Sequence, residues 1–275
     1  YILSEAGGGH GDDLWAASRH VANLLANKEK CLDLLAPLFS LQCCEEKQGV
    51  LLAKKQQHNY LHHDGPDHDH DHHPLLGVRF VELGAGAGVP SWTAMRCGAR
   101  VVCTDQAIAN RIRCIAECAE RNWREMKAAL IVPAGDDVAL VHGKEVRACP
   151  YDWGRPIEQL TRQPVLDYYK KKNGDRRLFD IVVAADCIYM PELHSLLLDS
   201  IKMLMAEQGV ALLPFALHGN TKDDSVWGIV ELAKGKGFQV EILESQQLTP
   251  QACNMESKRA LINMLRLTHS PDYYD

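Results

Sequence analysis

The sequence predicts an α/β protein with a Rossmann-like, seven-stranded, mostly parallel sheet that carries helices on both faces. From residue 75 onward, short apolar runs alternate with segments of helical periodicity, which is typical of helices packed on a parallel sheet. A turn with three glycines, at residues 84–88, directly follows the first apolar run. In the segment 180–185, the unbroken apolar run that follows Asp180 is typical of a strand that is buried on both faces.

Each element is placed from its hydrophobic period and from its boundary residues. In the helix after the glycine turn, Pro90 falls in the first turn, where its missing N–H costs nothing. The long segment 126–143 is expected to hold an extra hairpin around residues 135–137. The expected helices cover residues 13–27, 28–41, 89–97, 107–123, 192–206 and 223–236. The expected strands cover residues 78–83, 100–104, 145–151, 180–185, 210–215, 238–243 and 259–267.

Composition divides the chain into three segments. Residues 1–42 are expected to form an N-terminal helical cap, and residues 75–275 the main domain. Residues 43–74 form a low-complexity insertion rich in His and Asp, which cannot bury enough apolar area to offset the entropy of ordering. We therefore expect the insertion to be disordered. Clustered imidazoles also bind transition metals, but a solvated insertion with incidental affinity is favoured, and no metal site is expected.

Charge and composition narrow the classes of function. The net charge of −6 argues against a partner bound mainly through phosphates, so nucleic acid is not an expected substrate. The chain contains no apolar run long enough for a membrane span, and its first residues lack a secretion signal. Ten cysteines without a C-x-x-C pair fit a reduced cytoplasmic or nuclear protein better than a zinc or disulfide scaffold.

The glycine turn and its acidic neighbours predict a nucleoside cofactor. In an open α/β sheet, ligands bind beyond the carboxyl end of the first strand, where this turn lies. Asp105 ends the second strand, and a carboxylate there can accept both hydroxyl hydrogens of a ribose. A dinucleotide fingerprint requires glycine at position 89, but the chain has Val89. Glu82 suits an ammonium group better than a pyrophosphate. S-adenosylmethionine is therefore favoured over a nicotinamide dinucleotide.

Three motifs together resemble a known family. Residues 80–91 (FVELGAGAGVPS), 151–154 (YDWG) and 185–189 (ADCIY) are similar to the seven-β-strand methyltransferases of methyltransferase family 16. That family includes the methyltransferase-like 21 lysine methyltransferases and the fungal enzyme that methylates the N-terminal region of elongation factor 1A. Some members are described as nicotinamide N-methyltransferase-like. The similarity extends from about residue 14 to residue 267, except for the His-rich insertion.

The resemblance implies a role for each matching residue in binding S-adenosylmethionine. The glycines would pass the backbone around the methionine part, with Glu82 nearby. Asp105 would hold the ribose, Gln106 would lie near the adenine, and Trp153 would cover the adenine face. Trp15 would pack beside the cofactor, although a plain core position is an open alternative on a helical apolar face. The implied cofactor-binding residues are Trp15, Glu82, Gly84, Gly86, Gly88, Asp105, Gln106, Trp153 and Ala185.

The same resemblance assigns Asp186 and Tyr189 to the substrate. Asp186 and Tyr189 match a D/E-x-x-Y/F motif that would orient the accepting amine as catalytic residues. Two structural alternatives stay open: Asp186 could cap a helix, and Tyr189 could pack on that helix. The resemblance implies a monomeric enzyme that methylates a protein, such as a translation elongation factor or a chaperone. A small-molecule N-methyltransferase and a non-catalytic cofactor-binding protein are the other two hypotheses.

Overall fold

A single seven-stranded sheet organises the computed structural model, which describes residues 15–40, 73–129, 146–157, 178–217, 222–247 and 261–271. The strand order is β3-β2-β1-β4-β5-β7-β6. The first five strands in this order are parallel, and β7 runs antiparallel to both β5 and β6. The strands are β1 (Arg79–Glu82), β2 (Arg100–Asp105), β3 (Val146–Pro150), β4 (Phe179–Val183), β5 (Met205–Ala216), β6 (Phe238–Gln247) and β7 (Leu261–His269).

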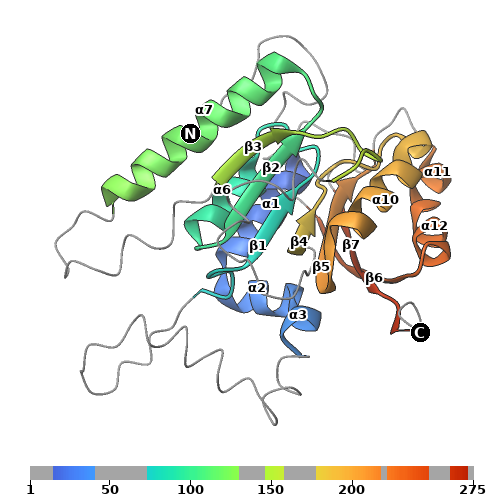
Figure 1. The fold of residues 1–275 in the computed structure, drawn as a ribbon. Coiled ribbons are helices and arrows are strands. Elements are labelled where there is room, and N and C mark those ends of the chain that lie inside the picture. Colours follow the sequence, from blue (N-terminus) through green and yellow to red (C-terminus); the bar gives the residue numbers. More distant parts are fainter. Residues whose placement is uncertain are drawn as a thin grey trace, which may run out of the picture.

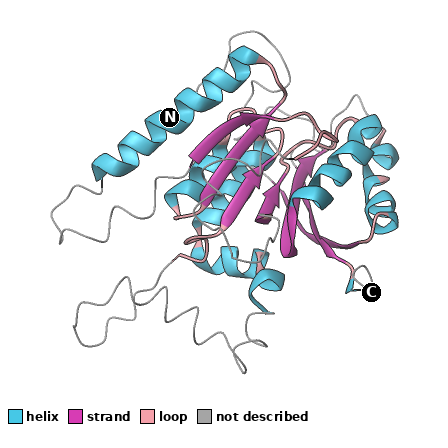
Figure 2. Cartoon of the chain, viewed as in Figure 1, coloured by secondary structure: helices cyan, strands magenta, loops and turns pink. Residues whose placement is uncertain are grey.

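Helices cover both faces of this sheet (Figures 1 and 2). One face carries α1, α2, α3, α6 and α7, and the other face carries α10, α11 and α12. The predicted class, a mostly parallel Rossmann-like sheet between two helical layers, is confirmed. The helices are α1 (Ala16–Ala26), α2 (Lys28–Leu34), α3 (Ala36–Ser40), α6 (Val89–Arg96), α7 (Ala109–Ala129), the 3-10 turn η1 (Pro191–Leu193), α10 (His194–Leu204), α11 (Asp223–Trp227) and α12 (Ile229–Gly235).

Alternate residues of the central strands pack in two different cores, because successive side chains of a strand point to opposite faces of the sheet. Phe80 and Ile181 pack in the core beneath α1 and α6. Their neighbours Val81 and Val182 pack in the core beneath α10 and α12. All four side chains are fully buried. Burial on both faces explains why these strands are continuous apolar runs in the sequence.

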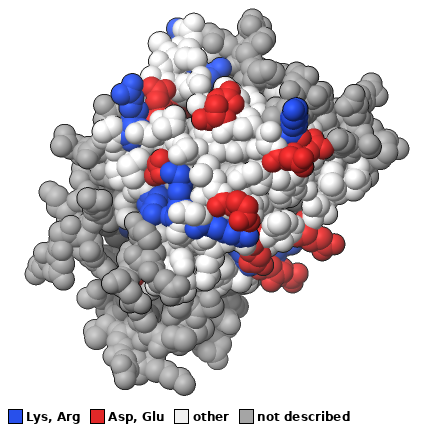
Figure 3. All heavy atoms as spheres, turned by 90° about the vertical axis from the view of Figure 1, so that its right-hand side faces the viewer, with Lys and Arg blue, Asp and Glu red and all other residues white. Residues whose placement is uncertain are grey.

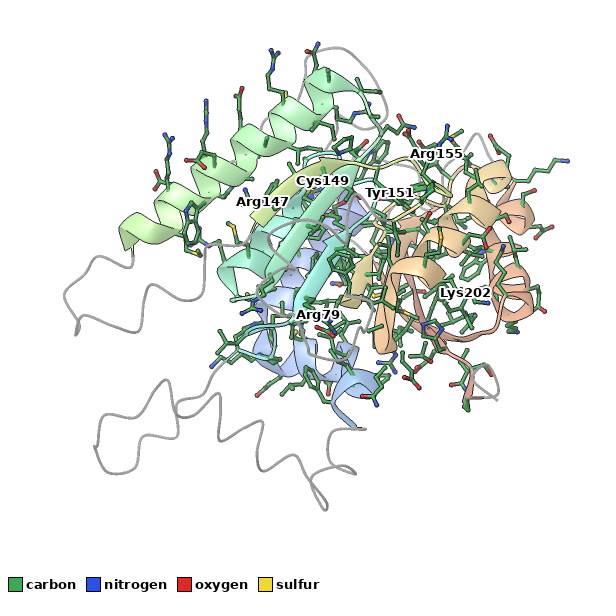
Figure 4. All side chains as sticks on the ribbon, viewed as in Figure 1. Arg79, Arg147, Cys149, Tyr151, Arg155 and Lys202 are labelled. Carbon is green, nitrogen blue, oxygen red and sulfur yellow. The ribbon has the colours of Figure 1, made fainter. Side chains whose placement is uncertain are left out.

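The order of the strands reverses at β1, which pairs with β2 on one side and β4 on the other. Such a switch point opens a crevice at the carboxyl ends of the strands. At the opposite edge, the backbone N–H and Nε of Arg79 donate to Asp180 Oδ2 at 2.8 and 3.0 Å. Figure 4 shows Arg79 at the lower end of the sheet, away from Tyr151. The switch point therefore favours a ligand site at the carboxyl edge, where Tyr151 lies.

Helix boundaries are where the structure departs most from the sequence prediction. The expected helix 28–41 is divided at Leu35, just before Pro37, because proline cannot continue the hydrogen-bond ladder of a helix. The expected helix 223–236 is divided at Gly228, a weak helix former. Helix α7 continues to residue 129 instead of ending at 123, and β5 begins at residue 205, inside the expected helix 192–206.

Two expectations lie outside the described residues. These are the disordered insertion, for residues 43–72, and the hairpin around residues 135–137. Among the helices that the structure does describe, none has the length and apolar character of a membrane span. The face formed by α10, α11 and α12 mixes basic and acidic side chains (Figure 3), several of them paired, as in Lys234–Glu231 and Lys236–Asp199. This face offers no broad basic surface for a polyanion.

Candidate active site at the carboxyl edge of the sheet

A cavity of about 470 Å³ opens above the switch point, within the usual range of ligand pockets. It brings together residues from the helix α1, the glycine turn, the end of β2, the loop after β3 and the loop after β4. All but one of the site residues predicted from the sequence line it, and the exception is Glu82. The predicted residues in its wall are Trp15, Gly84, Gly86, Gly88, Asp105, Gln106, Trp153, Ala185, Asp186 and Tyr189.

The glycine turn forms the floor of the cavity, and two of its positions require glycine. Gly84 has a φ of +63°, and a Cβ there would lie 2.8 Å from Cys187 Sγ and 3.2 Å from Trp153 Cζ2. Gly88 has a φ of +70°, and a Cβ would lie 2.6 Å from the Trp92 ring. Trp92 Nε1 in turn donates to the carbonyl of Ala87 at 2.8 Å. The turn is thus packed from below, which leaves its upper side to a ligand.

Asp105 is fixed at the end of β2 by three donors. Oδ2 accepts from the Gly86 N–H at 2.7 Å, and Oδ1 accepts from the Gln106 N–H at 2.7 Å. Arg111, in the first turn of α7, donates from Nη1 to Asp105 Oδ1 at 3.2 Å and to Gln106 Oε1 at 3.2 Å. An ionised carboxylate has about four acceptor sites, so this one still has capacity for a ligand hydroxyl. These bonds set its orientation before any ligand binds.

Glu82 lies beneath the glycine turn instead of facing the cavity. Its side chain is 1% exposed, and Oε2 accepts from the Ser91 N–H at 2.9 Å and from the Ser91 hydroxyl. Burial raises the pKa of Glu82 to about 8, and the bonds from Ser91 only partly oppose that effect. The carboxyl group therefore holds the first turn of α6 against the end of β1. The sequence placed Glu82 correctly at the end of the strand but did not reveal that Ser91 covers it.

The loop after β3 carries Trp153 into the cavity and is attached to α10 by one serine. Ser200 is fully buried, and its Oγ accepts from the Gly154 N–H at 2.7 Å and donates to the Leu196 carbonyl at 2.8 Å. Tyr151 Oη lies 3.2 Å from Ser200 Oγ and 3.0 Å from the Arg155 carbonyl. Figure 4 shows Tyr151 and Arg155 in this loop, beside α10. We call this hydrogen-bonded group, residues 151–155 with Leu196 and Ser200, the Ser200 clasp.

Asp186 follows β4 in a strained conformation. Its φ of 53° makes it the one non-glycine residue with positive φ in the described part of the chain. Oδ1 accepts from the Ala216 N–H at 2.9 Å, and the Asp186 N–H donates to the Pro214 carbonyl at 2.8 Å. The helical turn after it has Met190 as its N-cap residue and no side-chain cap, so Asp186 does not cap that turn. A strained, buried carboxylate at a cavity wall is typical of a functional position.

Tyr189 lines the cavity and is half-buried. Burial raises the pKa of Tyr189, an effect that nearby Cys187 reinforces and that the Arg111 cation opposes. The phenol is therefore neutral at physiological pH and can donate or accept a hydrogen bond. The rim beyond it is apolar and includes Met190, Leu193 and Leu196. Such a rim suits the aliphatic stem of a ligand and removes water from its polar end.

Sequence reasoning missed several wall residues. Cys187 is buried beneath Gly84, where its Sγ lies 3.3 Å from the Leu83 carbonyl. Asp152 accepts from the Ala107 N–H at 3.3 Å and so joins the loop after β3 to the loop after β2. Asp152 and Cys187 lie inside the recognised motifs, so their positions in those motifs could have identified them as site residues. The missed wall residues with polar or ionisable side chains are Ser18, Arg111, Tyr151, Asp152 and Cys187.

The sheet order, with the antiparallel β7 between β5 and β6, and the glycine turn at the switch point define the Rossmann-like fold of the seven-strand methyltransferases. A family model described as lysine methyltransferase matches residues 135–227. Over this segment the chain is similar to the lysine methyltransferase family that its motifs resemble.

Curated relatives agree with this family. The chain is 28% identical over 179 residues to the protein N-terminal and lysine N-methyltransferase EFM7 of Gibberella zeae, covering 63% of this chain and 62% of the relative. It is 29% identical over 171 residues to the EFM7 protein of Candida glabrata, covering 62% of this chain and 57% of the relative. The chain therefore spans about three fifths of the length of the curated relatives that it matches.

The solved structures that align with this chain are less similar to it in sequence. Magnesium protoporphyrin IX methyltransferase from Synechocystis PCC 6803, solved with bound SAM, aligns with a TM-score of 0.41 and 15% identity over 72% of each chain. The fibrillarin pre-rRNA processing protein of Methanococcus jannaschii aligns with a TM-score of 0.46 and 12% identity, covering 72% of this chain and 69% of that one. These are weak overall likenesses.

The cavity fits S-adenosylmethionine. The close packing of Cys187 and Trp153 against Gly84 leaves no room for a Cβ, so only bare backbone can line the floor there. Asp105 presents an oriented carboxylate at one end, as a ribose diol requires. Trp153 provides an aromatic wall beside Gly84, and Asp186 lines the same cavity. A nucleoside joined to a charged amino-acid part would therefore find matching groups in this cavity.

Proposed function

We propose that the chain is an S-adenosylmethionine-dependent N-methyltransferase that acts on a lysine or an N-terminal amine of a protein. One observation carries this proposal: a single cavity joins the glycine turn and Asp105 with Asp186 and Tyr189. The first pair suits a nucleoside, and the second pair suits an amine. The names of the EFM7 relatives support a protein as the substrate. We further propose a cytoplasmic, monomeric enzyme and a substrate among the translation factors or chaperones.

Some residues of this chain would bind the methyl donor, and others would orient the two reactants for methyl transfer. Bound in the cavity, S-adenosylmethionine would supply an activated methyl group on its sulfonium. Gly84, Gly86 and Gly88 would let the backbone approach the donor, Asp105 would hold its ribose, and Trp153 would cover its adenine. Ala185 would bring the end of β4 beside the reacting atoms. Holding two reactants in line can account for a large share of the acceleration.

The accepting amine must lose its proton before it can attack. A lysine has a pKa of about 10.4 in water, and burial in an apolar site lowers that pKa. The rim of Met190, Leu193 and Leu196 would desolvate the amine as it enters. Asp186, held by the Ala216 N–H, and the neutral phenol of Tyr189 would then orient it by hydrogen bonds. The two side chains act as positioning groups for the nucleophile.

The test is incubation of the purified chain with a labelled methyl donor and a cell extract, followed by identification of the labelled species. Label on a lysine or an N-terminal amine of a protein is the expected result. Label on a small amine instead would favour the small-molecule hypothesis. The absence of any label, together with intact binding of S-adenosylhomocysteine, would favour a non-catalytic protein.

The matched variant is Asp186→Ala. It should abolish transfer while it leaves affinity for S-adenosylhomocysteine nearly unchanged, because its carboxylate would contact the substrate. A calorimetric titration that shows equal loss of both properties would contradict the assignment of Asp186. Gln106, beside the adenine, serves as the opposite control: Gln106→Ala should weaken cofactor affinity and transfer together.

A further inference from the structure

Residues 184–193, between β4 and α10, carry the part of the cavity wall that would meet the accepting amine. Asp186, Tyr189 and Leu193 line the cavity from this connection. Residues 184–190 belong to no helix or strand, and the short turn η1 follows them. Backbone without a hydrogen-bond ladder is held by individual contacts, so the direction of Tyr189 depends on the contacts that fix this connection.

His194 makes one such contact. It is the first residue of α10 and only 3% exposed, and its Nε2 lies 2.7 Å from the carbonyl oxygen of Ile188. A carbonyl oxygen can only accept a hydrogen bond, so Nε2 carries the proton and is the donor. His194 does not line the cavity, although Leu193 before it and Leu196 after it do. The bond therefore joins the start of α10 to the connection from outside the cavity wall.

The partner of His194 connects this bond to the acceptor side of the cavity. Any buried imidazole needs a hydrogen-bond partner, but this one holds the carbonyl of the peptide unit that leads into Tyr189. Because a peptide unit is planar, fixing its carbonyl also fixes the direction in which the Tyr189 backbone leaves it. The Ile188 side chain is 1% exposed and packs in the same core as Leu197 and Leu198 of α10. Ile188 is thus held by α10 at both its side chain and its carbonyl.

Two fixed points directly before Tyr189 determine where its phenol lies. The helix that supplies them is a firm support, because Leu197, Ile201 and Leu204 of α10 are fully buried. Tyr189 itself is only half-buried, and it lines the same cavity as Asp186. Loss of the bond to Ile188 would let the peptide unit before Tyr189 rotate. The phenol would then no longer be held in a set position relative to the Asp186 carboxylate.

We propose that His194 is a positioning residue for methyl transfer: through the Ile188 carbonyl it keeps the Tyr189 phenol aligned with the accepting amine. This inference rests on the proposed function, in which Asp186 and Tyr189 orient that amine. The action of His194 is indirect, because its imidazole lies outside the cavity wall. Small misplacements of the groups that orient two reactants slow an enzyme strongly. Loss of the bond should therefore lower kcat and leave the binding of the methyl donor unchanged.

The experiment compares two neutral replacements of the imidazole. In His194→Gln the amide nitrogen lies as far along the side chain as Nε2 does, so it can still donate to Ile188. In His194→Asn the amide nitrogen lies only as far as Nδ1 and falls short. The measurements are labelled methyl transfer from S-adenosylmethionine into the proteins of a cell extract, and calorimetry of S-adenosylhomocysteine binding. His194→Asn should lower kcat about tenfold, since one buried hydrogen bond is lost, with the KM for the methyl donor and the affinity for S-adenosylhomocysteine unchanged. His194→Gln should keep most of the wild-type kcat.

A double-mutant cycle separates this role from a general effect on folding. His194→Asn is combined with Tyr189→Phe, which removes the hydroxyl that His194 would align, so the combined variant should be about as slow as Tyr189→Phe alone. Three results would overturn the role of His194: additive losses in the cycle, equal kcat in His194→Gln and His194→Asn, or a loss of S-adenosylhomocysteine affinity that parallels the loss of kcat. A wild-type chain that transfers no methyl group to protein would instead overturn the proposed function, so the two failures can be told apart.

Discussion

Asp105 and Glu82 are buried carboxyl groups at the ends of adjacent strands, and their surroundings give them different roles. Asp105 faces the cavity and accepts from Gly86, Gln106 and Arg111. Glu82 faces the protein interior, where Ser91 is its only donor among the described residues. Its other oxygen, Oε1, is buried without a partner. A buried carboxyl with few donors favours its neutral form, which agrees with the raised pKa of Glu82.

The raised pKa of Glu82 predicts how stability depends on pH. A pKa near 8 in the folded chain, against 4.5 as the ordinary value, means that the folded state holds the proton more tightly. Relative to Glu82→Gln, the free energy of unfolding of the wild type should be highest below pH 4.5. It should fall by about 1.4 kcal/mol per pH unit as the pH rises towards 8 and then level off.

Urea unfolding at pH 5, 6.5, 8 and 9 measures this difference between the wild type and Glu82→Gln. Gln keeps the shape of the side chain and can still accept from Ser91, so the comparison isolates the charge. A difference that does not change between pH 5 and pH 8 would contradict the account. A stability loss of the wild type confined to pH values below 4.5 would indicate an ordinary, ionised carboxylate.

At the scale of elements, the conformation of the glycine turn depends on the residues packed against it. Gly84→Ala would place a Cβ 2.8 Å from Cys187 Sγ at a φ of +63°. We expect a loss of about 1–3 kcal/mol in the free energy of unfolding and a marked loss of affinity for S-adenosylhomocysteine. Gly235→Ala is the control, because that position has open space around it. Similar losses in both variants, measured by thermal melting and calorimetry, would refute the assigned role.

The Ser200 clasp predicts a different pattern, since it acts on Trp153 through the loop. Ser200→Ala leaves the Gly154 N–H without its acceptor and should cost about 1–3 kcal/mol of stability. The looser loop should raise the KM for the methyl donor several-fold with little change in kcat. Quenching of tryptophan fluorescence by S-adenosylhomocysteine should weaken in parallel.

Ser225→Ala is the control for the clasp, since Ser225 is exposed on α11 and has no side-chain hydrogen bond in the described structure. It should change stability by less than about 0.5 kcal/mol. A fall in kcat with an unchanged KM in Ser200→Ala would show that the clasp acts on the substrate side instead. That outcome would contradict its role in holding Trp153.

Sequence patterns predicted the elements and residues that depend on local chemistry. The glycine turn, Asp105 and Asp186 were found because each follows directly from a strand and its boundary. Arg111 and Ser200 were not found, because their hydrogen-bond partners come from other elements. The hydrophobic periodicity of a sequence does not reveal such contacts. The same holds for Glu82: its place at the end of β1 was predicted, but only the packing of α6 shows that it faces Ser91.

At the scale of the whole molecule, the fold follows from alternation of strands and helices, but the order of the last strands does not. Strand β7 was expected from residues 259–267, and it lies between β5 and β6 in antiparallel pairing. That position depends on contacts between distant strands, which hydrophobic period alone does not specify. The cavity, in contrast, depends mainly on β1 to β4 and on α1, and ten of its 21 wall residues were predicted.

The central claim is that this cavity binds a sulfonium nucleoside and not a dinucleotide. Thermal melting of the purified chain with S-adenosylhomocysteine, and separately with a nicotinamide dinucleotide, tests it most directly. A ligand at one hundred times its dissociation constant stabilises a protein by about 2.7 kcal/mol, so the melting temperature should rise clearly with S-adenosylhomocysteine and stay unchanged with the dinucleotide. No rise at saturating S-adenosylhomocysteine, or an equal rise with the dinucleotide, would contradict the claim.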